Sequence, residues 1–341
     1  MKKKVKAGYI TKNYRKLVEN IGGIYQDGKK AAYQAVDTAM VLTYWNIGRE
    51  IVEFEQKGSE KAVYGESLLS NLSKDLKLRL GKGFSKSNIY FMRQFYLKKK
   101  IFQTVSGKLS WSHYVELLAV SDDLERSFYE KQCINEGWSI RELKRNKDTA
   151  LFHRLALSRD KKGILKLAAK GHVPGKIQDV IKEPYVLEFL KIPEENLKNE
   201  KHLEQKIIDN LQMFLMELGK GFAFVGRQYR ITLNNEHFFV DLVFYHRILK
   251  CFVLIELKIN KVKHQDIGQM NMYLNYFKAE ENTKGDGEPI GIILAAEKDD
   301  ITVKYATGGI SNKLFVSKYK LYLPDKNVLE DKVREIMGME N

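Results

Sequence analysis

The sequence predicts two domains of different fold class: an all-helical first domain followed by an α/β second domain, in short α + α/β. Two observations support this division. The three tryptophans lie before residue 170, whereas all five prolines lie after it. Helical periodicity fills the first half, whereas short apolar runs alternate with helical patterns in the second. A chain of 341 residues is long enough to form two cores.

The first half is expected to contain six to eight helices and no sheet. Apolar residues recur there at three- and four-residue spacing, as in AAYQAVDTAMVLTYWNIGREIVEFEQ and ESLLSNLSKDLKLRL. Ser85 is a predicted N-cap for the helix SKSNIYFMRQFYLKKK. SWSHYVELLAV and DDLERSFYEKQCINEGW continue the helical series.

All of the excess positive charge belongs to this helical half. Residues 1–170 contain 34 Lys and Arg against 18 Asp and Glu, whereas residues 171–341 contain 24 against 25. A basic domain attracts polyphosphates independently of their sequence, and that attraction is sensitive to salt. We therefore predict that residues 1–165 form a nucleic-acid-binding domain.

The helix that begins after Ser85 is the predicted contact with nucleic acid, through Arg93 and the basic run Lys98, Lys99 and Lys100. Its aromatic residues fit either a groove-binding surface or an ordinary core with solvated lysines around it. A protein-interaction or dimerisation module is the alternative for this domain.

The second half reads as a linker over residues 166–198 and an α/β domain over residues 199–341. KHLEQKIIDNLQMFLMELG is expected to be one helix that ends at Gly219. Strands follow in FAFVGRQYRITL, FFVDLVFYH and CFVLIELK, then the helix HQDIGQMNMYLNYFKAE and the strands IGIILAA and LFVSKYKLYL.

Cysteine content and hydropathy indicate a cytoplasmic protein that does not enter the membrane. No apolar run approaches the roughly 18 residues that a membrane-spanning helix needs. The only cysteines, Cys133 and Cys251, lie far apart, so neither a disulfide framework nor a zinc site is expected.

Two very apolar strands carry charged residues, which is the main functional signal in the sequence. If FFVDLVFYH and CFVLIELK form a hairpin that turns near Ile248 and Leu249, Asp241 lies opposite Glu256 and Val243 opposite Leu254. Lys258 then lies on the same face because strand side chains alternate. Val240, Leu242 and Phe244 are expected on the other, apolar face.

Two opposed, buried carboxylates repel each other unless a cation compensates them. Their hard oxygen ligands favour Mg²⁺ (or Mn²⁺) over zinc, and a nearby lysine fits phosphodiester hydrolysis. The alternative is a structural cluster in which Lys258 pairs with one of the carboxylates. Gln269 and Tyr273, spaced i, i+4 on the next helix, point to a site because they share one helix face directly after this strand.

These segments resemble the PD-(D/E)xK nuclease superfamily, specifically its YhcG-type proteins, over nearly the whole chain. FLMELGKGFAFVGRQYRI, FFVDLVFYHRILKCFVLIELK and GQMNMYLNYF are similar to its nuclease core. LTYWNIGREI, GFSKSNIYFMRQFY and LSWSHYVELL are similar to its helical first domain. The resemblance implies a restriction-endonuclease-like mixed β-sheet flanked by helices. One departure is Val240, which replaces the usual proline before Asp241.

The resemblance also implies roles for individual residues. Asp241 and Glu256 would be metal ligands and catalytic, Lys258 the catalytic lysine, and Gln269 and Tyr273 the motif on the following helix. Glu204 would be a third metal ligand, or else an ordinary surface glutamate. Arg227 and Gln228 are candidate phosphate contacts, or else ordinary residues at exposed strand positions.

The expected function is therefore a metal-dependent nuclease that acts on DNA, with RNA and a homo-oligomeric state left open. The alternative is a non-catalytic DNA-binding or complex-scaffolding protein that keeps the nuclease fold.

Overall fold

The computed structural model describes residues 12–56, 67–99, 107–157, 159–172, 181–182, 184–193, 196–323 and 325–339. The chain divides into two compact units, residues 1–126 and 127–341. The dividing point falls inside the region predicted to be the helical domain, so helices after residue 126 belong to the same unit as the sheet.

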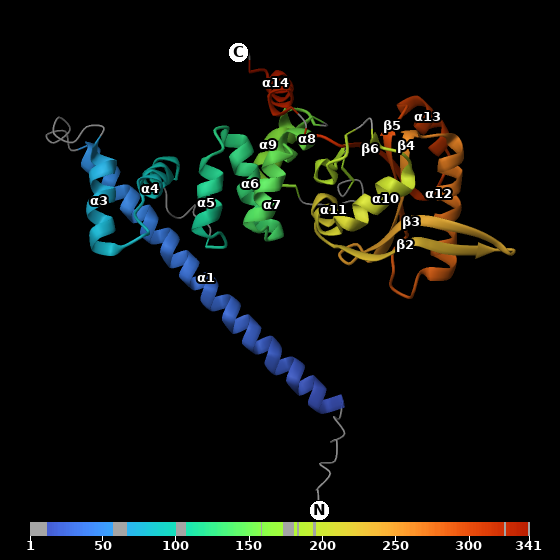
Figure 1. Cartoon of the computed structure of the whole chain (residues 1–341), viewed down its shortest axis with the longest axis horizontal. Helices are drawn as coiled ribbons and strands as arrows, with labels where there is room; N and C mark the ends of the chain where they lie inside the picture. Colours follow the sequence, from blue (N-terminus) through green and yellow to red (C-terminus); the bar gives the residue numbers. More distant parts are fainter. Residues whose placement is uncertain are drawn as a thin grey trace, which may run out of the picture. The chain divides into compact units, whose positions relative to one another are not determined.

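The first unit is built from helices (Figure 1). Its elements are α1 (Lys12–Gln56), α3 (Leu68–Leu80), α4 (Lys86–Lys98), α5 (Trp111–Leu118) and the first residues of α6 (Asp123–Glu136). The expected N-cap is confirmed, because the Ser85 side chain accepts a hydrogen bond from Asn88 N. α4 packs closely on α1, since a Cβ on Gly48 would lie 2.0 Å from Met92 O.

The second unit begins with a helical part and continues into the sheet. Its helical part consists of the rest of α6 with α7 (Ile140–Asp148), α8 (Leu151–Ala156) and α9 (Lys161–Lys170). The predicted helical first half is therefore confirmed, and no strand occurs among its described residues between 12 and 172. Nor is any helix in the described part of the chain long and apolar enough to cross a membrane.

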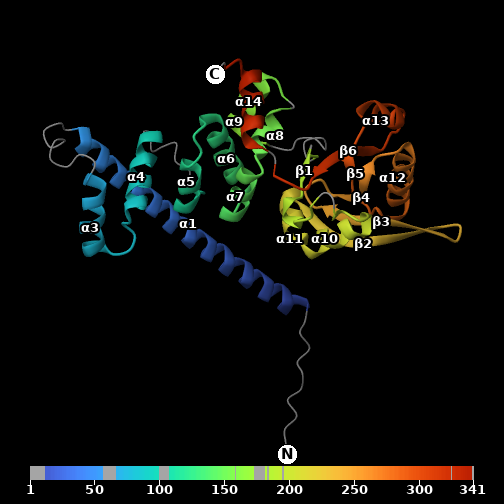
Figure 2. The same cartoon turned by 45° about the horizontal axis from the view of Figure 1, so that its top comes forward.

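Six strands form one mixed sheet in the order β1-β6-β5-β4-β3-β2. They are β1 (Tyr185–Val186), β2 (Phe222–Leu233), β3 (Glu236–His246), β4 (Cys251–Lys261), β5 (Ile290–Glu297) and β6 (Lys313–Lys320). The pairs β2–β3 and β3–β4 are antiparallel, whereas β4–β5, β5–β6 and β1–β6 are parallel. The β2–β3 hairpin extends beyond the rest of the sheet (Figure 2).

Helices cover both faces of this sheet and bury a core on each. They are α10 (Glu200–Asp209), α11 (Leu211–Leu218), α12 (His264–Tyr276) and α13 (Asp300–Thr307). The last helix, α14 (Lys326–Met337), packs instead on α8 of the helical part (Figure 1). Leu203, Ile207 and Phe214 of α10 and α11 pack on one face with Phe244 and Ile255. Residues of α12 pack on the opposite face with strand residues such as Val243 and Leu254.

The structure corrects some element predictions. The single helix expected before the sheet is two helices, α10 and α11, because Asn210 leaves the helical conformation (φ −120°, ψ 30°). Gly219 does follow the second helix, at φ 108°. The strand β1 lies within the predicted linker, and α13 and α14 were not expected.

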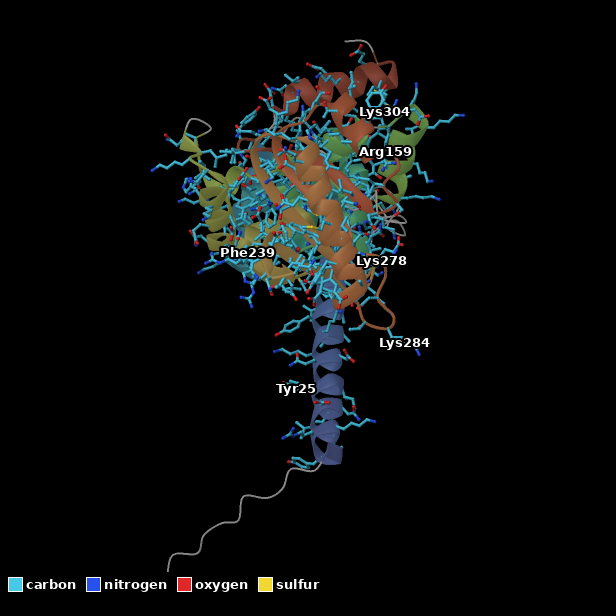
Figure 3. The ribbon with its side chains drawn as sticks, turned by 90° about the vertical axis from the view of Figure 1, so that its right-hand side faces the viewer. Tyr25, Arg159, Phe239, Lys278, Lys284 and Lys304 are labelled. Atoms are coloured by element: carbon cyan, nitrogen blue, oxygen red, sulfur yellow. The ribbon has the colours of Figure 1, made fainter. Side chains whose placement is uncertain are left out.

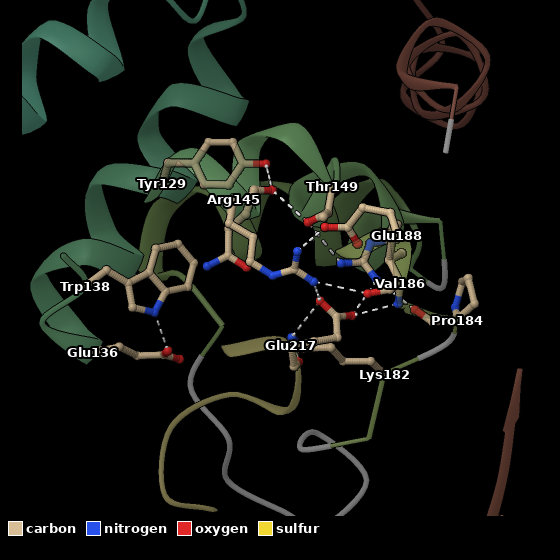
Figure 4. A network of polar contacts seen from close by, with 12 residues as sticks. Tyr129, Glu136, Trp138, Arg145, Thr149, Lys182, Pro184, Val186, Glu188 and Glu217 are labelled. Carbon is tan, nitrogen blue, oxygen red and sulfur yellow. Dashed lines mark hydrogen bonds and ion pairs between the residues drawn. The ribbon is translucent and has the colours of Figure 1, made fainter. Parts of the chain in front are cut away.

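A buried ionic network joins the helical part of the second unit to the sheet part (Figure 4). Glu217 of α11, whose side chain is 0% exposed, contacts Arg145 Nη2 at 3.1 Å and Arg154 Nη1 at 3.2 Å. It also accepts a hydrogen bond from Val186 N at 3.0 Å. Burial alone would raise the pKa of Glu217, but Lys182 and the two arginines outweigh burial and lower it. The carboxylate therefore holds α7, α8 and β1 around α11.

Glu217→Gln is expected to destabilise the second unit strongly, because it leaves three buried cations short of their counterion. Removing one partner of a buried ion pair costs about 3 to 5 kcal/mol, which corresponds to roughly 10 °C in melting temperature. Glu330→Gln is the matched control, since Glu330 forms an exposed pair with Arg334 whose loss costs less than about 1 kcal/mol. Thermal melts that show equal effects for both variants would contradict this role for Glu217.

Candidate active site

The candidate site lies where β3 and β4 separate. The two strands pair at the predicted register, with Val243 opposite Leu254, and their ladder ends at Leu242 and Ile255. Beyond that point β3 stays paired with β2, and β4 with β5. A side chain bridges the gap: the Asp241 carboxylate accepts a hydrogen bond from Leu257 N at 2.9 Å.

Asp241 and Glu256 are in contact across this gap, as the register predicted. Asp241 N donates to Glu256 Oε1 at 3.2 Å. The Glu256 side chain is only 5% exposed, and the strands on either side of it are covered by helices. Two carboxylates therefore meet at a point where the backbone ladder is open.

One detail of the face assignment is wrong, because side-chain alternation breaks at Asp241. Val240 was expected on the same face as Leu242, but it packs in the opposite core together with Val243. Across from Asp241 on the neighbouring strand, Gln228 has a left-handed backbone (φ 47°), which is also irregular for a strand. This break aims the Asp241 side chain at Gln228.

Glu204 reaches the site through Gln228. The Gln228 amide nitrogen donates to Glu204 Oε2 at 2.7 Å and to Asp241 Oδ1 at 3.0 Å. Glu204 lies on α10 and is buried, so it is not the surface glutamate of the alternative interpretation. One amide thus joins the carboxylates of α10 and β3.

Lys258 lies between carboxylates and pairs tightly with none. Its Nζ is 3.9 Å from Glu256 Oε2 and 3.5 Å from Asp266 Oδ1, at the start of α12. Burial alone would lower the pKa of Lys258, but Glu256 and the other nearby carboxylates outweigh burial and raise it. The ammonium group therefore stays charged at neutral pH.

Gln269 and Tyr273 form a hydrogen-bonded pair on α12, as their spacing suggested. The Gln269 amide donates to the Tyr273 hydroxyl, which donates in turn to the Phe239 carbonyl oxygen at 3.2 Å. Burial, assisted by Glu256, raises the pKa of Tyr273 to about 12. The neutral phenol thus fixes β3 two residues before Asp241.

The carboxylates of the site are hard to ionise together. Burial, reinforced by the charge of Asp241, raises the pKa of Glu256 to about 8. Burial also raises the pKa of Asp241 and of Glu204, against the hydrogen bonds that each accepts. Electrostatic repulsion is therefore built into the site, and a cation would relieve it.

The donor set fits a hard divalent cation. Asp241 and Glu256 offer only carboxylate oxygens, which Mg²⁺ and Mn²⁺ prefer, and Mg²⁺ usually takes one or two protein carboxylates with water or phosphate as the remaining ligands. No group of three or more His, Cys, Asp or Glu side chains in the described part of the chain is arranged to hold a metal ion. Glu204 is engaged with Gln228, so the fit rests on the other two carboxylates.

The predicted nucleic-acid contacts are spread over both units. Arg93 Nε donates to both carboxylate oxygens of Glu55, at 2.9 and 2.8 Å. Lys98 is exposed at the end of α4, Lys99 follows it, and Lys100 lies outside the described residues. Arg227 is exposed on β2 and donates to Gln205 at 2.8 Å.

Asp266 was not predicted as a site residue, and Gln228 was predicted only as a phosphate contact, yet both contact predicted site residues. Asp266 precedes Gln269 and Tyr273 by three and seven residues, a spacing that places all three on one helix face. That spacing was the available signal. The contact of Gln228 with two carboxylates had no such signal, because it depends on a local backbone conformation that no sequence pattern specifies.

Comparison with known proteins agrees with this geometry. Residues 178–334 match the family described as the YhcG PDDEXK nuclease domain, and residues 20–154 match the DUF1016 N-terminal domain. YhcG of Escherichia coli (strain K12), a candidate nuclease, is 39% identical over 95% of this chain and 94% of its own length.

Two solved structures are also similar over part of the chain. A repair endonuclease from Pyrococcus abyssi shares 20% identity over 37% of this chain and 48% of its own, with a TM-score of 0.27. An EndoMS complex with double-stranded DNA shares 17% identity over 37% and 46%, also with a TM-score of 0.27.

The raised pKa of Glu256 predicts that the metal-free protein loses stability as pH rises from its ordinary pKa of 4.5 to about 8. In that window the folded protein keeps a proton that the unfolded chain has released, so unfolding becomes easier with each increase in pH. Glu256→Gln is expected to remove most of this dependence, roughly 2 to 4 kcal/mol between pH 5 and 9.

Denaturant unfolding in EDTA at several pH values measures this effect. Glu236→Gln, on an exposed strand position of the same sheet, serves as the control and should keep the wild-type dependence. A Glu256→Gln profile as steep as that of the wild type would show that Glu256 is already ionised in the fold.

Proposed function

Because the chain belongs to the YhcG family of PDDEXK nucleases, we propose that it is a divalent-metal-dependent deoxyribonuclease that hydrolyses phosphodiester bonds at the Asp241–Glu256 site. The observation that carries the proposal is the pair of buried, opposed carboxylates with a charged lysine beside them, at the point where two strands separate. PDDEXK nucleases generally use divalent metal ions, and a bound Mg²⁺ or Mn²⁺ would supply an activated water and charge neutralisation.

Each protein group then has a definite task. Asp241 and Glu256 would hold the ion, because their mutual repulsion makes them poor partners for anything but a cation. Lys258 keeps its proton, so it would stabilise the negative charge that develops on the phosphate and would not act as a base.

The remaining site residues would position the Asp241 carboxylate. Tyr273 fixes the β3 backbone beside Asp241, and Gln269 orients the Tyr273 hydroxyl. Gln228 holds the Asp241 carboxylate from the opposite side and links it to Glu204. These contacts would keep the ligands within the narrow geometry that metal-assisted hydrolysis requires.

DNA is the proposed substrate because the first unit is basic, with 23 Lys and Arg against 13 Asp and Glu in residues 1–126. We further propose that the basic helical half contributes sequence-independent affinity, through Lys98 and Lys99 among others. The competing function is a DNA-binding or scaffolding protein that keeps the fold without cleaving.

Asp241→Asn is expected to abolish cleavage and the response to metal, yet leave the metal-free protein as stable as wild type or more so, because it removes a buried charge that opposes the ionisation of Glu256. Wild type should gain about 2.7 kcal/mol of stability at a hundredfold excess of Mg²⁺ over its dissociation constant. Thermal melts of both proteins with and without Mg²⁺, run beside cleavage assays, measure both effects.

The structural-cluster alternative makes the opposite forecast for this variant. If Asp241 only neutralises the charge of Lys258, the Asn substitution should lower the free energy of unfolding by about 3 to 5 kcal/mol. Mg²⁺ should then leave the stability of the wild-type protein unchanged. A wild-type protein that cleaves no linear, nicked, branched or single-stranded DNA in Mg²⁺ or Mn²⁺ would support the scaffolding alternative.

Replacing Lys98 and Lys99 with Gln in the full-length protein is expected to weaken DNA binding uniformly across sequences. The slope of log affinity against log salt should fall by about 2, since two phosphate contacts are lost. Lys284→Gln with Lys304→Gln, two exposed lysines of the second unit (Figure 3), matches the change in charge. Equal slopes for the two double variants would remove these lysines from the proposed interface.

A further inference from the structure

The outer half of the β2–β3 hairpin has one buried and one exposed face. Its turn, Asn234 and Asn235, has positive φ at both residues (46° and 68°), as a tight two-residue hairpin turn requires. On the buried face, Ile231 and Val240 are fully covered by the core under α12, with Tyr229 and Phe238 packed against them.

The exposed face begins at the candidate active site. Side chains alternate along a strand, so the face opposite the α12 core carries the intervening residues. Three pairs follow one another toward the turn: Gln228 with Asp241, Arg230 with Phe239, and Thr232 with His237. The last pair is joined by a 3.0 Å contact between Thr232 Oγ1 and His237 Nδ1.

Phe239 is the unusual member of this face. The residue is 45% exposed, although the apolar packing of the hairpin is already made by the other face. It lies two residues from Asp241, roughly 7 Å along the strand and about two stacked base steps of a B-form strand. Arg230, directly across from it, adds an exposed positive charge.

An exposed aromatic ring beside an arginine suits an unpaired nucleotide. The ring offers a flat surface for a base, and the guanidinium group can pair with the adjacent phosphate. A base inside a duplex is already stacked on both sides and presents no free face to such a ring. The chemistry of this face therefore distinguishes single-stranded nucleotides from paired ones.

We propose that Phe239 and Arg230 bind an unpaired nucleotide about two steps from the scissile phosphate, so that the protein prefers DNA with a single-stranded or splayed segment over fully paired duplex. This inference rests on the proposed nuclease function and names the substrate class of the same site. Phe239 would determine specificity, since it contacts the substrate outside the reacting atoms.

Binding measurements on the full-length Lys258→Met protein, which separates binding from cleavage, test the proposal. The probes are a fluorescein-labelled fork with single-stranded arms and a fully paired duplex of equal length, followed by fluorescence anisotropy in Mg²⁺. Adding Phe239→Ala should weaken fork binding about tenfold, the loss of one base stack, and change duplex binding less than about twofold. Phe239→Trp should restore fork binding.

Tyr305→Ala is the matched control, because Tyr305 of α13 is 79% exposed and lies outside the hairpin. It should change neither affinity. Equal losses on fork and duplex after Phe239→Ala would overturn the proposal, as would no loss on either probe or no binding of the fork by the Lys258→Met protein.

The nuclease function is tested separately by incubating the wild-type protein with both probes in Mg²⁺. Selective loss of fork binding without any cleavage would leave the nucleotide site in place and reject the nuclease. Cleavage of both probes at equal rates, with fork binding unaffected by Phe239→Ala, would keep the nuclease and reject the specificity site.

Discussion

The site depends on the repulsion between two carboxylates that the fold forces together. Asp241 and Glu256 face each other because the β3–β4 register is fixed by apolar pairs such as Val243 and Leu254. The core on both faces of the sheet stabilises that register, so the carboxylates cannot move apart without moving buried side chains. The sheet thereby holds a local arrangement that is unfavourable by itself, as functional sites commonly do.

The surrounding contacts restrain these carboxylates and do not neutralise them. Gln228 holds Asp241, Tyr273 fixes the strand before it, and Lys258 stays more than 3 Å from every carboxylate that it faces. A fully paired site would have no affinity left for a cation. The contrast with Glu217 is direct, because three cations and a backbone amide satisfy that buried carboxylate and its pKa is lowered. The cluster around Glu217 stabilises the fold, whereas the proposed role of the Asp241–Glu256 cluster is to bind a cation.

Much of this arrangement could be predicted from the sequence, since strong periodicity and strand pairing determine it. The pairing of Val243 with Leu254 and the spacing of Gln269 and Tyr273 both follow from regular geometry. The side-chain break at Asp241 could not be predicted, because it is a local departure from regular strand geometry, next to a left-handed residue, Gln228, on another strand. The division of helix α10 from α11 was also missed, because it depends on the non-helical backbone of one residue, Asn210, within a continuous helical pattern. Burial of Glu217 was also invisible, since its partners are 31 to 72 residues away along the chain.

The most direct test of the metal site is an anomalous-scattering measurement on crystals of the protein soaked in Mn²⁺. We predict a single peak within coordination distance, about 2.0 to 2.3 Å, of an oxygen of Asp241 and an oxygen of Glu256. Crystals that show no peak there, with Lys258 Nζ instead hydrogen-bonded to Glu256, would contradict the proposal that repulsion between these carboxylates prepares the site for a cation.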